Sequence, residues 1–164
     1  MRMKQLMVFI LLCAPRIGYG QTPDSLPTPK SDHVLGGIRD KCEGMSFCLT
    51  GIYCQDEVLY YRIAAVNQSS LIYDVDGLRC TIRDKKVLRR HAIQEVDMTP
   101  LWIKGDSLRV APGQRSVWLV ALRKEVLPPG RYLSIGLLER HGSRDLELKV
   151  GYRQLLRAKK YSEK

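Results

Sequence analysis

NQSSLIYDVDGLRCTIRDKKVLRRHAIQEVDMTPLW, residues 67–102, is the stretch that decides the fold of this chain. Apolar residues at Leu78, Cys80 and Ile82 alternate with polar ones, which is the pattern of a β-strand with one buried face. A charged loop, Asp84–Lys85–Lys86, follows, and a second extended run leads from Val87 towards Met98. The stretch predicts paired β-strands and contains no recognisable catalytic motif.

Similar short segments recur between residues 44 and 150, and turn-forming residues separate them. In Leu146–Val150 the alternation is strict, so one face of that strand is expected to meet solvent. Short strands at this spacing predict an all-β fold, an antiparallel immunoglobulin-like β-sandwich, for which about 100 residues is the usual size. The expected strands are Met45–Cys54, Val58–Val66, Leu71–Asp84, Val87–Met98, Ser107–Ala111, Arg115–Arg123, Arg131–Glu139 and Arg144–Val150, with turns at 67–70, 104–106, 111–113, 128–130 and 141–143.

Gly51 interrupts the first of these strands. Phe47 and Leu49 alternate before it, and Ile52 and Cys54 resume on the shifted parity, so we expect a β-bulge that keeps all four on one face. The side chains expected to be largely buried are Phe47, Leu59, Tyr61, Leu78, Ile82, Leu119, Leu133, Ile135, Leu146 and Leu148.

The two ends of the chain are expected to lie outside the sandwich. Residues 1–20 combine a basic start, an apolar run and small residues before Gln21, and predict a secretory signal peptide. The alternative is a lipoprotein signal with Cys13 as the lipidated residue, although bulky Leu12 precedes it. Residues 21–43 begin with three prolines in nine residues and predict a linker, and residues 151–164 predict a basic tail with room for a short helix.

Charge and cysteine content follow from that prediction of export. Of 27 basic residues, Arg2, Lys4 and Arg16 lie within residues 1–20, which leaves 24 basic against 17 acidic residues, or +7. Such a charge favours acidic partners, but the acidic residues are interleaved, and export argues against direct binding to cytoplasmic nucleic acid. Four cysteines remain after cleavage. Cys48 and Cys54 would lie about 20 Å apart on one strand at roughly 3.3 Å per residue, too far for a disulfide, and Cys80 is expected to be buried.

Candidate chemical groups are sparse. His33, His91 and His141 stand apart, and no Ser, Thr or Cys lies in a nucleophile motif. Asp74 and Asp76 lie on the same face of a strand, and such a pair is more typical of a turn or strand edge than of a calcium site. The five-residue gaps between Cys42, Cys48 and Cys54 are unlike the closely spaced cysteine pairs of structural zinc sites. We therefore predict no enzyme activity, no metal, no cofactor and no small-molecule substrate.

Three motifs resemble the TraN family of Bacteroides-type conjugative transposons. They are Tyr73–Asp76 leading to Arg79, then Ile82–Lys86, and Ala92–Glu95 followed by Pro100. The likeness extends loosely from Gly44 to Val150 and corresponds to the carboxy-terminal β domain of that family. TraN proteins typically carry a further amino-terminal β domain where this chain has its leader and proline-rich stretch, and Cys54, Cys80 and His91 are unlike the residues expected at their positions.

The resemblance implies a structural rather than a catalytic role. TraN-like proteins are periplasmic parts of the conjugative type IV secretion apparatus, associated with its outer-membrane core, so the expected partners are other conjugation proteins and the membrane association is indirect. The alternative is a stand-alone secreted β-sandwich binding module. The residues predicted to bind a partner are Arg83, Lys85, Lys86, Arg89, Arg90, Gln94 and Glu95; for Gln94 and Glu95, cross-strand pairing with Arg83, Arg89 or Arg90 is the simpler interpretation.

Overall fold

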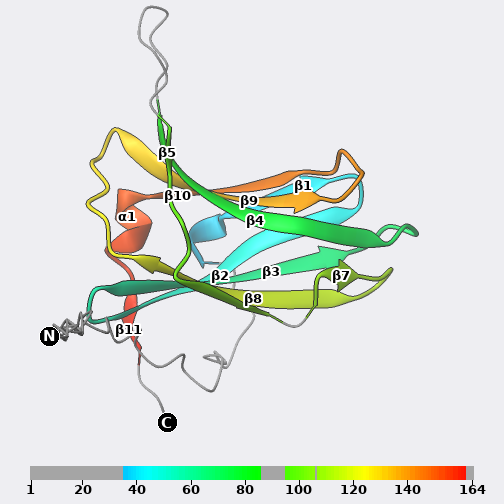
Figure 1. Ribbon diagram of the computed structural model, residues 1–164, viewed down its shortest axis with the longest axis horizontal. Coiled ribbons are helices and arrows are strands. Elements are labelled where there is room, and N and C mark those ends of the chain that lie inside the picture. The colour runs from blue at the N-terminus through cyan, green and yellow to red at the C-terminus, as the bar shows by residue number, and fades with distance from the viewer. Residues whose placement is uncertain (1–34, 86–94, 106, 162–164) are drawn as a thin grey trace, which may run out of the picture.

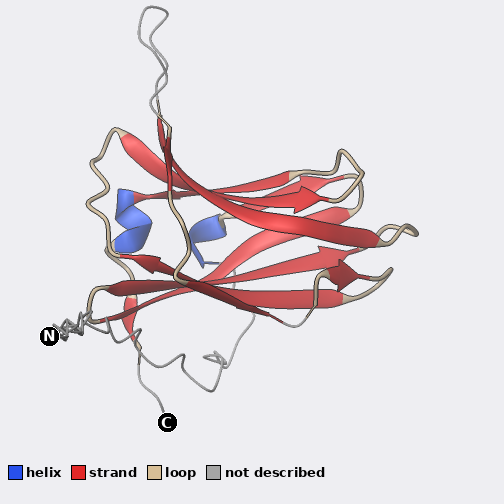
Figure 2. Cartoon of the chain, in the orientation of Figure 1, coloured by secondary structure: helices blue, strands red, loops and turns tan. Residues whose placement is uncertain are grey.

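The computed structural model describes residues 35–85, 95–105 and 107–161, and these form a β-sandwich (Figure 1, Figure 2). Two sheets face each other, and the described helices are short. Sheet I contains β1 (Arg39–Cys42), β2 (Met45–Gln55), β3 (Val58–Asn67), β6 (Trp102–Gly105), β8 (Arg115–Arg123) and β11 (Lys159–Lys160). Sheet II contains β4 (Tyr73–Asp84), β5 (Val96–Asp97), β7 (Arg109–Val110), β9 (Arg131–Glu139) and β10 (Leu146–Gly151). The helices are the 3-10 turn η1 (Leu35–Gly37) and α1 (Tyr152–Leu155).

The order of the strands is that of an immunoglobulin constant-type domain. Sheet I runs β1-β2-β3-β8-β6 and sheet II runs β10-β9-β4-β5. Strands β2, β3, β8 and β6 therefore take the places of A, B, E and D, while β10, β9 and β4 take those of G, F and C. All these pairings are antiparallel. The predicted antiparallel immunoglobulin-like β-sandwich is confirmed.

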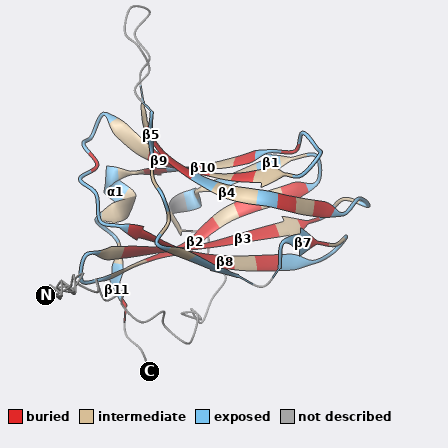
Figure 3. Cartoon of the chain, in the orientation of Figure 1, coloured by how far each residue is buried: buried red, intermediate tan, exposed pale blue. Residues whose placement is uncertain are grey.

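The core lies between the sheets and is built by alternation along each strand (Figure 3). Along β3, Leu59, Tyr61 and Ile63 point into the core, and the residues between them face the other side of sheet I. The expected bulge is present, because the register of β2 against β3 shifts between Leu49 and Gly51. Nine of the ten residues predicted to be buried are so; Leu78 is half-buried and packs against the core.

The free edge of β2 is covered by strands from both ends of the fold. β1 pairs with residues Met45–Cys48, and β11 runs parallel to Tyr53–Cys54. β1 also joins the sheets, since the backbone N–H of Glu147 in sheet II donates to Asp40 Oδ2 over 2.8 Å. Covering an edge strand in this way removes a row of unpaired backbone groups.

Several strands fall where the sequence predicted none, whereas the short helix α1 lies in the tail, where room for a short helix was expected. β1 lies within the range expected to be a linker, and α1 and β11 lie within the expected tail, so the described fold extends beyond residues 44–150. The turn predicted at residues 104–106 is wrong for its first part, because Lys104 and Gly105 belong to β6. Of the strand expected at Val87–Met98, β5 is described, and residues 86–94 lie outside the described residues. The predicted signal peptide, Cys13 and the first part of the predicted linker lie outside them too.

The burial of Cys80 agrees with the sequence prediction. Cys80 is buried, and within the described part of the chain Cys42, Cys48, Cys54 and Cys80 form no disulfide. Among the described helices, none is long and apolar enough to cross a membrane.

Candidate functional site

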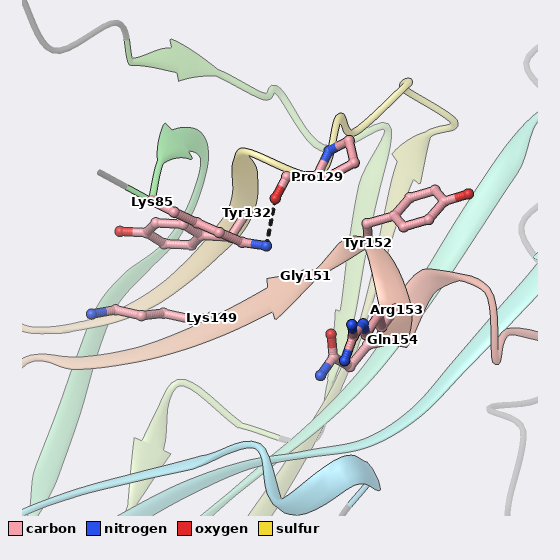
Figure 4. Close-up of a pocket in the computed structure, with 8 residues that line it drawn as sticks. All are labelled: Lys85, Pro129, Tyr132, Lys149, Gly151, Tyr152, Arg153 and Gln154. Atoms are coloured by element: carbon pink, nitrogen blue, oxygen red, sulfur yellow. Dashed lines mark hydrogen bonds between the residues drawn. The ribbon is translucent and has the colours of Figure 1, made fainter. Parts of the chain in front are cut away.

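A basic cleft of about 650 Å³ opens at the end of the sandwich where β4 and β10 finish and β9 begins (Figure 4). Three cationic side chains contribute to it, Lys85, Lys149 and Arg153, together with two tyrosines. We call this site the basic cleft. It is lined by Lys85, Pro129, Tyr132, Lys149, Gly151, Tyr152, Arg153 and Gln154.

Strand pairing brings the two sides of the basic cleft together. Arg83 of β4 is the register partner of Tyr132 in β9, so Lys85 leaves β4 beside the turn that precedes β9. The Lys85 backbone N–H donates to Gly130 O over 2.9 Å, and its Nζ donates to Pro129 O over 2.7 Å. The Pro129 carbonyl fixes the position of the Lys85 ammonium group but, being uncharged, does not neutralise its positive charge.

Lys149 stands on the neighbouring strand. Its Nζ lies 5.8 Å from the centroid of the Tyr132 ring, within range of a cation–π contact, and 3.2 Å from Glu147 Oε2. The hydrogen bond and charge of Glu147 raise the pKa of Lys149 above its ordinary value. Lys149 is therefore positively charged over the whole physiological pH range.

The third cation enters through the turn from β10 into α1. A Cβ at Gly151 would lie 3.0 Å from Gln154 Oε1 and 3.8 Å from Lys85 Nζ. The absence of a side chain at Gly151 therefore lets Lys85 lie close to the turn between β10 and α1. Arg153 is exposed, and no side chain in the described part of the chain pairs with its guanidinium.

Beside the basic cleft, Glu147 links charged residues across the outer face of sheet II. Arg83 Nη1 lies 3.1 Å from Glu147 Oε1, and the Ser134 hydroxyl donates to the same oxygen over 2.5 Å. Burial alone would raise the pKa of Glu147, but hydrogen bonds from Ser134 and Lys149, with the charges of Lys149 and Arg83, outweigh it and lower the pKa. Arg83 Nε also lies 3.1 Å from Glu95 Oε1, an ion pair without hydrogen-bond alignment.

The chemistry that this lining supports is recognition of negative charge. The described residues that line the basic cleft include cations, tyrosines and an amide, but no carboxylate, imidazole or thiol. Lysine and arginine side chains fit a carboxylate or another anion, and a neighbouring tyrosine ring such as that of Tyr132 can contact an apolar group beside it.

The residues predicted to bind a partner are only partly brought together. Lys85 lines the basic cleft, whereas Arg83 is held by Glu95 and Glu147, so the pairing expected for Glu95 is confirmed. Lys86, Arg89, Arg90 and Gln94 lie outside the described residues. The sequence analysis missed the cleft residues Tyr132, Lys149, Tyr152, Arg153 and Gln154. Two signals were available: Lys149 lies on the solvent-facing side of its strand, and the basic residue Arg153 follows the end of that strand at Gly151.

The other candidate groups are used in surface ion pairs. Asp74 Oδ1 lies 3.3 Å from Arg109 Nε, and Asp76 Oδ1 lies 3.5 Å from Arg140 Nε. Within the described ranges no cluster of three or more His, Cys, Asp or Glu residues could hold a metal ion. His141 lies in the β9–β10 turn with φ of +57°, while His33 and His91 fall in parts that the structure does not describe.

Comparison with known proteins gives a family. The model of a domain of unknown function, DUF4138, matches residues 29–160. The chain belongs to the DUF4138 family. The matched range takes in both sheets and the basic cleft, and it includes β1 and β11, which lie outside the boundaries expected from the sequence. No curated protein and no solved structure matches the chain.

Proposed function

We propose that this protein is a non-enzymatic scaffold component of a conjugative transfer apparatus, type IV secretion-like, in the cell envelope. The proposal starts from the motifs that resemble TraN proteins between Tyr73 and Pro100. The DUF4138 match is consistent with a conjugative-transposon-associated family. The all-β sandwich is the architecture that the resemblance implies for these residues.

The observation that carries the proposal is the chemistry of the basic cleft. Lys85, Lys149 and Arg153 line a cleft of about 650 Å³ together with Tyr132 and Tyr152, and no acid, imidazole or thiol lies among its described lining residues. Such a site supports docking of an acidic segment of another protein better than it supports turnover of a substrate. Other conjugation proteins are the proposed partners.

The proposed location is the periplasm, with outer-membrane association through those partners. It rests on the leader-like residues 1–20 and on the resemblance. A chain cleaved near Gly20 should be released from membranes when partner contacts are disrupted by salt. Incorporation of a labelled lipid precursor at Cys13 would instead identify a lipoprotein.

The test is affinity purification from the native cell envelope followed by mass spectrometry. We expect other conjugation proteins to co-purify, and Lys85→Glu with Arg153→Glu to reduce their recovery by tenfold or more, since reversal replaces attraction with repulsion. Reversal of Lys86, Arg89 and Arg90 tests the remainder of the predicted docking loop. The matched control is Arg109→Glu with Arg140→Glu; Arg109 is in β7, at the opposite end from α1 (Figure 1).

Two results would overturn the scaffold role. One is the absence of every conjugation protein from the purified material, and the other is an unchanged transfer frequency after deletion of the gene. Both together would favour the stand-alone secreted binding module.

A further inference from the structure

The end of the sandwich that carries the basic cleft also exposes apolar side chains. Val126, in the loop between β8 and β9, is 90 % exposed, and Leu156, which follows α1, is 68 % exposed. Tyr152, the first residue of α1, is exposed as well. We call Val126, Tyr152 and Leu156 the apolar tip. The loop between β8 and β9 lies beside α1 at this end of the molecule (Figure 1).

Both segments that carry the apolar tip are packed against the fold. Leu127, which follows Val126, is buried, and it lines a small pocket together with half-buried Leu155, the residue before Leu156. The two segments meet again at the basic cleft, to which one contributes Pro129 and the other Tyr152. Val126 and Leu156 are therefore exposed on anchored parts of the chain.

The cations around the apolar tip lack acidic partners. Lys124, Arg153 and Arg157 are exposed, and in the described part of the chain none of them forms an ion pair. Two carboxylates, those of Glu57 and Glu125, belong to the same end, because the Lys124 N–H donates to Glu57 O over 2.8 Å. Neither carboxylate pairs with a cation among the described residues, so the three positive charges remain available to an anionic surface.

The opposite end of the sandwich differs in this respect. It exposes two leucines to a similar degree, Leu71 at 66 % and Leu108 at 64 %. The arginines near them, Arg109 and Arg140, are each paired with an aspartate. Exposed apolar residues therefore occur at both ends, and their combination with unpaired cations distinguishes the end that carries α1.

This combination is the chemistry by which proteins bind membrane surfaces. Apolar side chains enter the boundary between lipid headgroups and acyl chains, while lysine and arginine attract anionic lipid. Tyrosine is enriched at the same boundary, because its ring is apolar and its hydroxyl is polar.

We propose that the apolar tip and its flanking cations dock this protein directly on a membrane surface that contains anionic lipid. The contact is additional to the membrane association through partners that is proposed above. It does not depend on the scaffold role, because Lys124, Val126, Leu156 and Arg157 lie outside the lining of the basic cleft.

The test is co-sedimentation with lipid vesicles in the absence of any other protein. The full chain, purified after export, should bind vesicles of phosphatidylcholine and phosphatidylglycerol in equal parts, and bind phosphatidylcholine vesicles much more weakly. Lys124→Glu with Arg157→Glu should weaken binding to the mixed vesicles at least about 25-fold, since each basic residue near an anionic surface contributes roughly a fivefold increase. The matched control reverses two exposed cations of β1 that form no ion pair in the described structure, Arg39→Glu with Lys41→Glu, and should bind nearly as the parent does.

A second pair of variants tests the apolar contact. Val126→Ser with Leu156→Ser leaves the charge unchanged and should weaken binding to the mixed vesicles about tenfold, because methylene groups are withdrawn from the lipid. Leu71→Ser with Leu108→Ser, matched in exposure at the opposite end, should bind as the parent does. Equal urea midpoints of the variants and the parent check that the fold is retained.

Three results would overturn the proposal. They are equal binding of the parent to both kinds of vesicle, unchanged binding after reversal of Lys124 and Arg157, and unchanged binding of the variant with serine at positions 126 and 156. Because the vesicles contain no conjugation protein, each of these results leaves the scaffold role standing. Failure of the scaffold role in the co-purification experiment, in turn, leaves vesicle binding unaffected.

Discussion

At the scale of single residues, Arg144 forms the most completely buried ion pair among the described residues. Its side chain and that of Glu139 are each 8 % exposed, and the two are hydrogen-bonded. Arg144 also donates to Ile72 O over 2.8 Å and lies 5.2 Å from the centroid of the Tyr73 ring. The pair ties the β9–β10 turn to the start of β4.

Removing one member of this pair should be costly. Arg144→Met leaves the Glu139 carboxylate buried without its partner, and we expect a loss of about 3 kcal/mol in the free energy of unfolding, measured by urea denaturation. Arg144→Met with Glu139→Gln is the matched variant and should recover part of that loss. Equal urea midpoints for Arg144→Met and the parent would contradict a stabilising role for the pair.

The same pair predicts the effect of acid. The hydrogen bond from Arg144 lowers the pKa of Glu139, and partial burial opposes this without reversing it. A carboxyl whose pKa is lower in the folded state stabilises the fold above its unfolded pKa, about 4.3, and that stability is lost as pH falls through the folded pKa. The difference in unfolding free energy between the parent and Glu139→Gln should therefore be constant near neutral pH and shrink below about pH 4. A difference that grows on acidification would show that the sign is wrong.

Cys80 gives a residue-scale prediction about reactivity. Burial raises the pKa of its thiol to about 12, so native protein at pH 8 should leave Cys80 unmodified by a maleimide while the half-buried cysteines react. Mass spectrometry of tryptic peptides, with urea-unfolded protein as the control, measures this. A peptide in which Cys48 and Cys54 are linked would contradict the course of β2.

At the scale of elements, regular alternation made the central strands predictable. β8 and β9 have the bounds expected from the sequence, and β3 differs by one residue, because their inner faces are continuous and apolar. β1 gave no such signal, since Arg39–Cys42 is an edge strand of mostly polar residues. The basic cleft could not be predicted from local sequence patterns. Tyr132 and Lys149 come close to Lys85 only because β9 pairs with both β4 and β10, which are far apart in the sequence.

β6 shows why composition misled at Gly105. Glycine before an acidic residue resembles a turn, yet Gly105 pairs with Trp118 across the β6–β8 ladder. A Cβ at Gly105 would come within 1.9 Å of Trp118 Cδ1, so the indole occupies the space beside the glycine. The glycine is required by packing and not by a turn.

This packing gives a prediction for the edge of sheet I. Gly105→Ala should displace Trp118 or β6 and lower the free energy of unfolding by about 2 kcal/mol, in the range expected for overpacking. Gly77→Ala is the matched control, because a Cβ there meets nothing within 4 Å. Urea denaturation followed by tryptophan fluorescence measures both, and equal destabilisation by the two variants would argue against the Trp118 contact as the cause.

At the scale of the whole molecule, strands from near both ends of the fold complete the sandwich. β1 and β11 together cover the edge of β2, and the hydrogen bond from Glu147 N to Asp40 joins the sheets on that side. Buried Tyr161 follows β11 on the outer face of sheet I. These segments therefore belong to the folding unit, as the extent of the DUF4138 match, residues 29–160, also indicates.

The boundaries of the folding unit can be tested with two fragments. Residues 21–161 retain β1, α1 and β11, whereas residues 44–150 lack them. The shorter fragment would expose the backbone N–H and C=O groups of β2 along its edge, together with the apolar residues that η1 and Tyr161 cover. An exposed edge of this kind promotes strand pairing between molecules.

We expect residues 21–161 to unfold in one transition and to give a strand-type circular dichroism spectrum. The free energy of unfolding of residues 44–150 should be lower by several kcal/mol, because the apolar contacts of the removed segments are lost. This shorter fragment should also self-associate on analytical ultracentrifugation. The matched intermediate fragment, residues 21–150, separates the contribution of β11 from that of β1. If residues 44–150 are monomeric with the same urea midpoint as residues 21–161, the terminal strands are accessories and the boundaries expected from the sequence describe the independent domain.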